Sequence, residues 1–252
     1  EIEQRFQRIQ DFLGSPLWRQ TPHPLPFGAR GAVRRDRRAL DDMIDVEIAA
    51  ARHTTEHDPS DILAVLVARG ELSDTEIRDQ VKTLIGAGYD TTASSLAWIV
   101  WEAALCDGLW ERIRDEASES FRDGHPVDVS ALRLAGRTVR EGLRLHPGSG
   151  IAPRVTRDEI RLVGVTIPRA TIVAWSPYLT GRDPACWRDP DRFDPDRHLE
   201  GGDGTPAELA WLPFGRGPRS CIGFGLALMQ LTLIVARLAQ RVDLSPTAQT
   251  VP

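Results

Sequence analysis

The sequence predicts a mainly α-helical chain with a minor β-sheet. Apolar residues recur at helical spacing along most of the chain up to His146. After His146 and Pro147 the pattern changes to short β-type runs, which Gly164 and Pro168 interrupt. No linker separates the two kinds of segment, so we expect residues 1–252 to form a single domain.

The composition is that of a globular protein. The chain has 252 residues, of which 41% are hydrophobic and 27% are charged, enough to bury a substantial core. A net charge of −5 disfavours nucleic acid as a partner. The three cysteines (Cys106, Cys186 and Cys221) indicate a reducing, cytoplasmic compartment without a disulfide framework. The sequence contains no apolar run of transmembrane length and does not open with a signal peptide.

Six helices are expected before the change of pattern. The fourth of them is very long, and Ser73 with Glu76 forms a capping box at its start. The short helix before it lies in DPSDILAVLVARG. The long helix is expected to continue from the capping box to about Leu105, and the other expected helices cover residues 2–13, about 32–53, about 109–121 and about 130–145.

The remaining third of the chain is expected to hold a sheet, a long connection and a final helix. The sheet is predicted in RVTRDEIRLVGVTIPRATIVAW, residues 154–175. Residues 176–213 are aperiodic and rich in Asp, Pro, Arg and Gly. A connection of this length is usually functional in a compact domain. The last helix is predicted over residues 222–241.

The segment WLPFGRGPRSCIGFG, residues 211–225, places a cysteine in a glycine-rich loop before a helix. The helix dipole and the nearby Arg216 and Arg219 favour the thiolate form of Cys221. The glycines let a flat, bulky group approach the backbone. No Cys or His beside Cys221 completes a zinc site, so iron in a macrocycle fits better. A buried structural cysteine and a catalytic nucleophile remain as alternatives.

FGRGPRSCIG, with Phe214, Gly217, Arg219, Cys221 and Gly223 in register, resembles the haem-binding loop of the cytochromes P450. The resemblance implies haem b, with Cys221 as the axial ligand of the iron. It also implies that the haem contacts the neighbouring residues of the loop and the long helix. These contact residues are Pro213, Phe214, Arg219, Ile222, Gly223, Ala87 and Gly88.

The stretch AGYDTT, residues 87–92, is unusual for a helix interior. Gly86 and Gly88 each cost about 1 kcal/mol relative to alanine, and Thr91 can turn its hydroxyl onto a backbone carbonyl. The residues alone fit an ordinary glycine packing site beside a solvated Asp90. The family resemblance implies that Asp90 and Thr91 are catalytic, as an acid–alcohol pair that delivers protons during the activation of dioxygen.

EGLR, residues 141–144, places Glu141 and Arg144 on one helix face at i, i+3 spacing. A pair on the surface would stabilise the chain very little. The segment resembles the Glu-x-x-Arg motif of the family. That resemblance implies a structural triad, for which we expect Arg192, in PDRF, to be the third member.

Arg154 begins the first predicted strand, where the family resemblance implies an arginine on a haem propionate. A guanidinium suits a carboxylate because it offers two parallel donors. Arg219 is the second candidate for the same contact. An exposed surface arginine remains the alternative interpretation of Arg154.

The resemblance covers the chain from end to end and predicts a cytochrome P450 fold that is incomplete. We expect a C-terminal portion with roof helices, the long central helix, the Glu-x-x-Arg helix, the meander, the cysteine loop and the final helix. A preceding N-terminal region would be missing, and a membrane anchor there is left open.

The resemblance also implies a haem-thiolate monooxygenase. It would insert one atom of dioxygen into a lipophilic small molecule, with electrons from a separate ferredoxin or reductase. Two alternatives stay open: a haem-binding protein without turnover, and a truncated, inactive product.

Overall fold

The computed structural model describes residues 2–16, 20, 28–54, 58, 60–121, 127–199 and 210–245. Contacts group the chain into two compact units, Glu1–Ala87 and Gly88–Pro252, and helix α5 is continuous from one into the other. The expectation that residues 1–252 form one domain stays a prediction.

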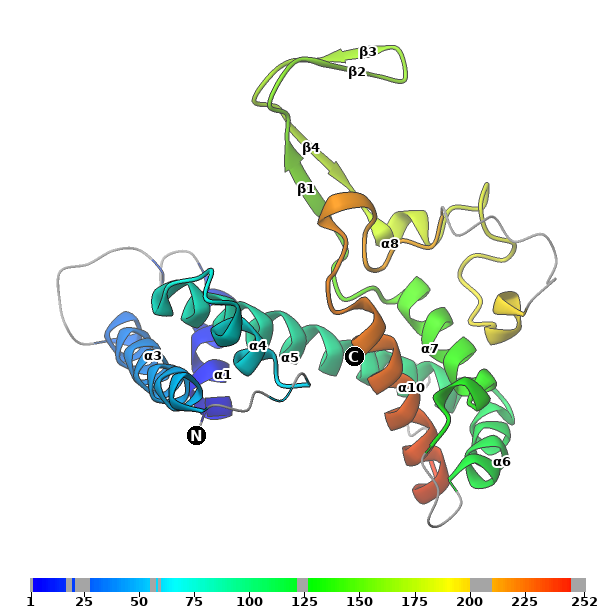
Figure 1. The fold of residues 1–252 in the computed structure, drawn as a ribbon. Helices are drawn as coiled ribbons and strands as arrows, with labels where there is room; N and C mark the ends of the chain where they lie inside the picture. Colours follow the sequence, from blue (N-terminus) through cyan, green and yellow to red (C-terminus); the bar gives the residue numbers. More distant parts are fainter. Residues whose placement is uncertain are drawn as a thin grey trace. The chain divides into compact units, whose positions relative to one another are not determined.

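The first unit is helical. It contains α1 (Ile2–Leu13), α3 (Ala29–His53), α4 (Ile62–Arg69) and the start of α5 (Asp74–Leu105) (Figure 1). Its core is formed by four aliphatic side chains: Ile44, Ile48, Val67 and Ile77. The predicted capping box is present, because the amide of Ser73 donates to the carboxylate of Glu76 at 2.8 Å and the amide of Glu76 donates to the Ser73 hydroxyl at 3.3 Å.

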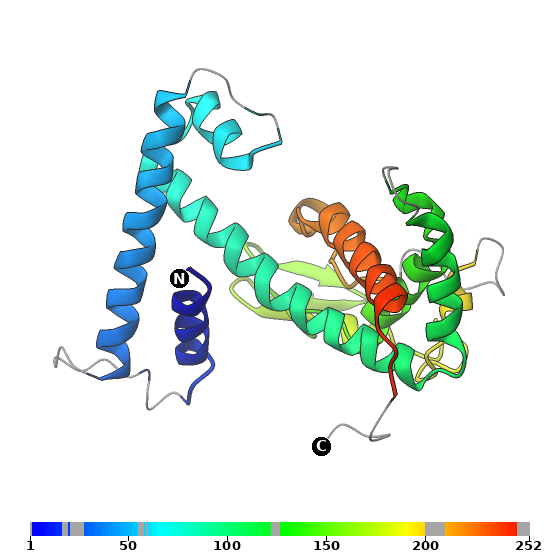
Figure 2. The same cartoon turned by 90° about the horizontal axis from the view of Figure 1, so that it is seen from below.

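A second helical core surrounds the end of α5. It is closed by α6 (Leu109–Ser120), α7 (Arg133–Leu145) and α10 (Phe224–Arg241), with the 3-10 turn η1 (Val129–Ala131) before α7. Figures 1 and 2 show α10 lying along α6 and α7. Ile99, Ile113, Val139 and Val235 are fully buried in this core.

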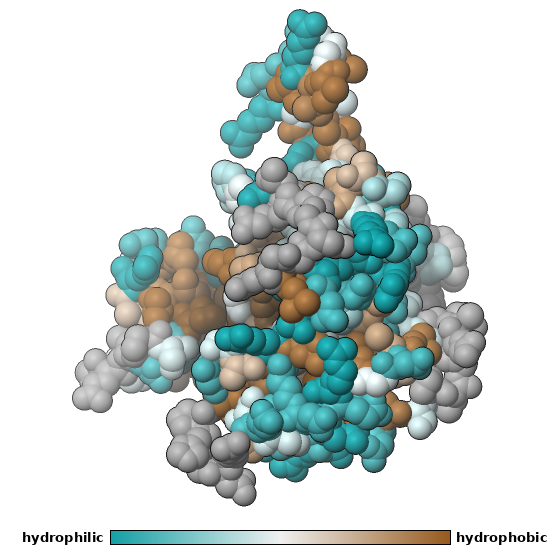
Figure 3. All heavy atoms as spheres, turned by 90° about the vertical axis from the view of Figure 1, so that its right-hand side faces the viewer, coloured by the Kyte–Doolittle hydropathy of each residue, from teal (hydrophilic) through white to brown (hydrophobic). Residues whose placement is uncertain are grey.

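The sheet region consists of two antiparallel ladders. β1 (Ala152–Val155) pairs with β4 (Ile172–Trp175), and β2 (Ile160–Leu162) pairs with β3 (Val165–Ile167). The β2–β3 hairpin projects beyond the first ladder and carries hydrophobic side chains at the top of Figure 3. Val163 at its turn is 95% exposed.

The predicted aperiodic connection contains only short turns where it is described. These are α8 (Pro177–Thr180) and the 3-10 turn η2 (Pro195–His198). The part of the connection over residues 200–209 lies outside the described residues. Among the helices of the described ranges, none combines the length and apolarity that a membrane crossing requires.

Candidate functional site

Cys221 lies between the 3-10 turn η3 (Gly217–Arg219) and the first turn of α10. The amide of Cys221 donates to the carbonyl of Phe214 at 2.9 Å, which closes the loop on itself. Gly215 and Gly217 have φ angles of 68° and 78°, in the left-handed region that favours glycine. The local path of the loop therefore depends on these two glycines.

Aromatic side chains hold the loop against α7 and α10. The indole nitrogen of Trp211 donates to the carbonyl of Arg140 at 3.0 Å, and the Arg140 guanidinium lies 4.3 Å from the ring centroid of Trp211. Phe214 meets Phe224 edge to face, with their centroids 5.0 Å apart. Sequence reasoning missed Arg140, Trp211 and Phe224. Trp211 and Phe224 lie near the two ends of the segment 211–225. These aromatic residues were the indication in the sequence that the loop is packed against a neighbour.

The surface beside Cys221 is open, and several apolar side chains are exposed on it. A cavity of about 380 Å³ is lined by Cys221, by aromatic side chains and by two arginines, Arg140 and Arg216, among others. Cys221 is exposed, Ile222 is 91% exposed and Leu226 is 50% exposed. Apolar side chains gathered beside a thiol form a surface that a hydrophobic group would cover.

Gly223 and Pro213, the other two predicted loop contacts, flank the cysteine turn. The carbonyl of Gly223 accepts from the amide of Ala227 at 2.8 Å and so begins α10, while Pro213 is partly exposed. A Cβ atom on Gly223 would lie 3.8 Å from the sulfur of Cys221, in ordinary contact.

The donor set fits haem better than a bare metal ion. Within the described ranges, no group of three or more His, Cys, Asp or Glu side chains could hold a metal. A lone thiolate suits an iron whose other ligands come from a macrocycle. A Cβ atom on Gly88, Gly215 or Gly217 would meet nothing within 4 Å, so space for a flat group is available there.

The other two cysteines are weaker candidates for the ligand. Cys106 and Cys186 are partly buried. Burial raises the pKa of the Cys106 thiol, and the carboxylate of Asp194 adds to the effect. A raised pKa disfavours the thiolate that binds iron.

The stretch AGYDTT remains helical within α5. Ala87 ends the first unit, while Gly88, Asp90 and Thr91 belong to the second. Asp90 and Thr91 are both exposed. A Cβ atom on Gly148 would lie 3.2 Å from the Cβ atom of Thr91, so the backbone of Gly148 packs directly on that threonine.

The two predicted propionate partners are exposed arginines. Arg154 on β1 donates to the carbonyl of Pro153 at 2.7 Å and lies 4.8 Å from the ring centroid of Trp175. Arg219 lies in η3. In the part of the chain that is described, neither guanidinium is within ion-pair distance of a carboxylate, so each has the capacity to bind one.

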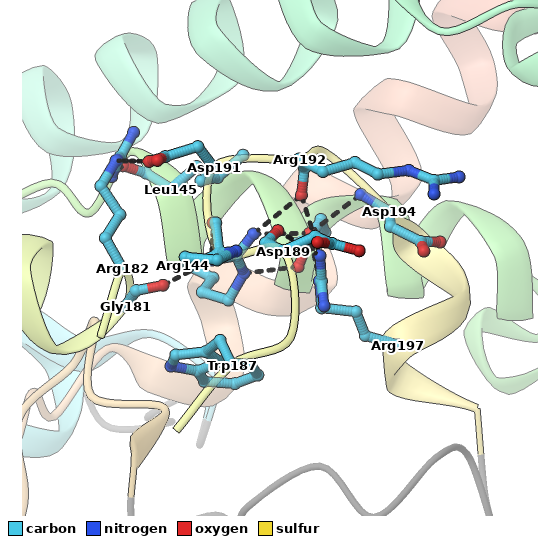
Figure 4. A network of polar contacts seen from close by, with 12 residues as sticks. Arg144, Leu145, Gly181, Arg182, Trp187, Asp189, Asp191, Arg192, Asp194 and Arg197 are labelled. Atoms are coloured by element: carbon cyan, nitrogen blue, oxygen red, sulfur yellow. Dashed lines mark hydrogen bonds and ion pairs between the residues drawn. The ribbon is translucent and has the colours of Figure 1, made fainter. Parts of the chain in front are cut away.

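The predicted Glu141–Arg144 pair is present and fully buried. Its two hydrogen bonds are both 2.8 Å long, which is a bidentate geometry. Arg144 also donates to the carbonyls of Gly181 and Pro190 in the long connection. Figure 4 shows how these bonds tie that connection to α7.

The prediction that Arg192 supplies the third side chain is wrong. The side chain that bonds Glu141 is Arg197, whose Nε lies 3.0 Å from the carboxylate. Arg192 contributes only its backbone carbonyl, which accepts from both Arg144 and Arg197 at 3.1 Å, and its exposed guanidinium points away (Figure 4). The turn η2 directs Arg197 inward, where it is 7% exposed.

His198 is a further partner that sequence reasoning missed. Its Nε2 lies 3.0 Å from the second carboxylate oxygen of Glu141. Its position directly after Arg197 was the only signal in the sequence. The buried carboxylate therefore has partners from α7 and from the connection before the cysteine loop.

The comparisons with known proteins agree with this geometry. The family model "Cytochrome P450" matches residues 2–252. "Pentalenene oxygenase" of Streptomyces avermitilis is 34% identical over all of this chain and 59% of its own length. "Cyclooctat-9-en-7-ol 5-monooxygenase" of Streptomyces melanosporofaciens is 35% identical over 94% of this chain and 52% of its own length.

A solved structure, "Retinoic acid bound cyanobacterial CYP120A1", superposes with a TM-score of 0.85 at 26% identity. The match covers 99% of this chain and 58% of that one. The chain thus spans little more than half the length of these relatives.

Proposed function

Since the chain belongs to the cytochrome P450 family, we propose that it forms the haem-binding part of a monooxygenase. The reaction would insert one oxygen atom of dioxygen into a lipophilic small molecule. The observation that carries the proposal is the exposed thiol of Cys221 in a glycine loop beside exposed apolar side chains. When bound, a thiolate-ligated haem supplies the activation of dioxygen.

Membership of the family implies a haem-iron cofactor, and we propose haem b. Cys221 would hold the iron, and Ile222 and Phe214 would contact the haem. Arg154 and Arg219 would bind the propionates, because their guanidinium groups are exposed and can offer two donors to a carboxylate.

Asp90 and Thr91 are proposed to move protons. Both are exposed and adjacent on α5, so a carboxylate and a hydroxyl are available at one place on the helix. General acid–base groups of this kind contribute about 10²–10⁴-fold to rate. The protons they deliver would let one oxygen atom of dioxygen leave as water.

A lipophilic substrate is supported by the similar solved structure, which is named for bound retinoic acid, a lipophilic molecule. For electrons we propose a separate ferredoxin or reductase, in keeping with membership of the family. Three free cysteines support a reducing, cytoplasmic location.

The test is Thr91→Ala in the haem-loaded protein. Without the hydroxyl, we expect haem binding to be retained and product formation to fall by about 10²-fold. Two electrons and two protons would instead leave with dioxygen as hydrogen peroxide. The measurement is the ratio of peroxide to oxygenated product per electron pair consumed.

Thr83→Ala is the matched control. Thr83 lies on the same helix, is exposed, and its hydroxyl donates to the carbonyl of Asp79 at 2.7 Å. We expect the control to keep its product ratio. Normal ratios in both Thr91→Ala and Asp90→Asn would show that the pair has no part in proton delivery.

A further inference from the structure

Glu102 and His146 form a pair between α5 and the end of α7. The Nε2 atom of His146 lies 2.7 Å from a carboxylate oxygen of Glu102, and both side chains are mostly buried. The imidazole also stacks on the indole of Trp98, with centroids 4.3 Å apart and planes within 4°. Because Trp98 and Glu102 are four residues apart on α5, they hold one imidazole from two sides.

The turn that follows His146 contacts the proposed proton-delivery residue. Pro147 fixes its own φ angle and so restricts the path to Gly148. A Cβ atom on Gly148 would lie 3.2 Å from Thr91 Cβ and 3.6 Å from the Ser95 hydroxyl. If this turn shifted, the backbone of Gly148 would therefore move toward Thr91 or away from it.

Packing alone does not fix the turn, because one side of it borders a cavity. The cavity has a volume of about 250 Å³ and is lined by Ser95, Trp98, His146 and Gly148, among others. A segment that borders open space can move without displacing packed atoms. The imidazole of His146, held by a hydrogen bond and a stacked ring, anchors the start of the turn, and the Ser176 hydroxyl donates to the carbonyl of Gly150 at its end at 2.6 Å.

We propose that Glu102 and His146 are positioning residues that hold Thr91 in place through the backbone of Gly148. The proposal rests on the proposed function, because the position of Thr91 affects the reaction only if Thr91 delivers protons. Neither residue is taken to contact haem or substrate. If either residue were lost, the turn could move. The Thr91 hydroxyl would then no longer be held in the position from which it delivers protons.

Three substitutions in the haem-loaded protein test the pair. Glu102→Ala removes the acceptor, His146→Phe keeps a ring on Trp98 without the hydrogen bond, and Glu102→Gln keeps a group that can bond Nε2. Two quantities are measured: the methyl resonance of Thr91 in carbon-13-labelled protein, and the peroxide-to-product ratio. Glu119→Ala, an exposed glutamate on α6, is the control.

We expect Glu102→Ala and His146→Phe to bind haem normally, to shift the Thr91 methyl resonance and to raise the peroxide fraction severalfold. Glu102→Gln and Glu119→Ala should match the parent protein in both quantities. A purely structural role would lower stability in Glu102→Ala without moving the Thr91 resonance in the folded protein.

If the Glu102 and His146 variants do not fold, Gly148→Ala tests whether the turn positions Thr91. It leaves the Glu102–His146 hydrogen bond in place but adds a methyl group 3.2 Å from Thr91 Cβ. It should shift the same resonance, whereas Gly150→Ala should not, because the nearest atom is Tyr178 Cβ at 4.0 Å.

An unmoved Thr91 resonance in the folded Glu102→Ala, His146→Phe and Gly148→Ala proteins would overturn the proposal. Failure of the proposed function has a different signature. Thr91→Ala would then keep its product ratio, while the resonance in the other variants would still report on positioning.

Discussion

Glu141 is a fully buried carboxylate with donors on both oxygens. Burial by itself raises its pKa, but the hydrogen bonds from Arg144 and His198 outweigh burial and lower the pKa from 4.5 to about 2. The amide of Asp194 adds a hydrogen bond of 2.9 Å. The charged form of Glu141 is therefore the form that the fold stabilises.

The lowered pKa of Glu141 predicts a loss of stability in acid. Because its folded pKa lies below the unfolded value, the contribution is present above about pH 4.5 and declines as the pH falls toward 2. Its size is about 3 kcal/mol. Urea unfolding between pH 2 and 6 should show a shallower acid dependence for Glu141→Gln than for the parent. Equal slopes for the two proteins would contradict the assignment.

Arg197 and Arg192 provide a matched pair of substitutions. Arg197→Ala removes a donor to Glu141 and to the carbonyls of Asp189 and Arg192, so we expect a loss of about 3–5 kcal/mol. Arg192→Ala keeps the backbone carbonyl and should change stability by about 0.5 kcal/mol or less. The free energy of unfolding is measured for both variants. A larger loss for Arg192→Ala than for Arg197→Ala would support Arg192 as the third member of the triad.

The error over Arg192 shows what sequence spacing cannot decide. The tripeptide Pro-Asp-Arg occurs twice, at residues 190–192 and 195–197. The arginine of either copy could be the third member of the triad with Glu141 and Arg144. The choice is made by the turn η2, whose start is capped by the side chain of Asp194. The Glu102–His146 pair could not be predicted from sequence spacing either, because 44 positions separate the two residues.

At the scale of elements, α7 packs closely against α5 at Gly142. A Cβ atom there would overlap the side chain of Ile99 and lie 3.4 Å from its Cα atom. The two helices carry Thr91 and Glu141, so their spacing links the proposed proton-delivery residue to the buried polar network.

Gly142→Ala should therefore destabilise the fold by about 1–3 kcal/mol through overpacking. Gly136→Ala, on the same helix, would bring its Cβ no closer than 4.0 Å to Thr232 and should be neutral or stabilising by up to about 1 kcal/mol. Because the overlapping atom is Ile99 Cγ1, Gly142→Ala combined with Ile99→Ala should lose less stability than the sum of the two single variants. Additive effects in that double mutant would argue against a direct clash.

Helices with clear periodicity were predicted well, and their ends less so. α1 and α5 have the predicted bounds, whereas α7 begins at Arg133 and not at residue 130, because the 3-10 turn η1 precedes it. That turn is capped by the side chain of Asp128. The single predicted sheet is two separate ladders, since periodicity identifies strands but not their pairing.

At the scale of the whole molecule, the polar network and the cysteine loop form one continuous support. Glu141 binds the long connection, and Arg140, the residue before it, binds Trp211 at the start of the cysteine loop. Adjacent residues of α7 thus bind Asp194, Arg197 and His198 on one side and Trp211 on the other. We therefore expect the buried ion pair and the Arg140–Trp211 contact together to help fix the position of the Cys221 thiol.

The proposal that Cys221 is the axial ligand of haem iron can be tested by an absorption spectrum. Carbon monoxide is added to the reduced, haem-loaded protein, and the Soret band is recorded. We predict the red-shifted band of thiolate ligation, its loss in Cys221→His, and its persistence in Cys106→Ser and Cys186→Ser. A histidine-type band in the parent protein, or an unchanged band in Cys221→His, would show that Cys221 is not the ligand.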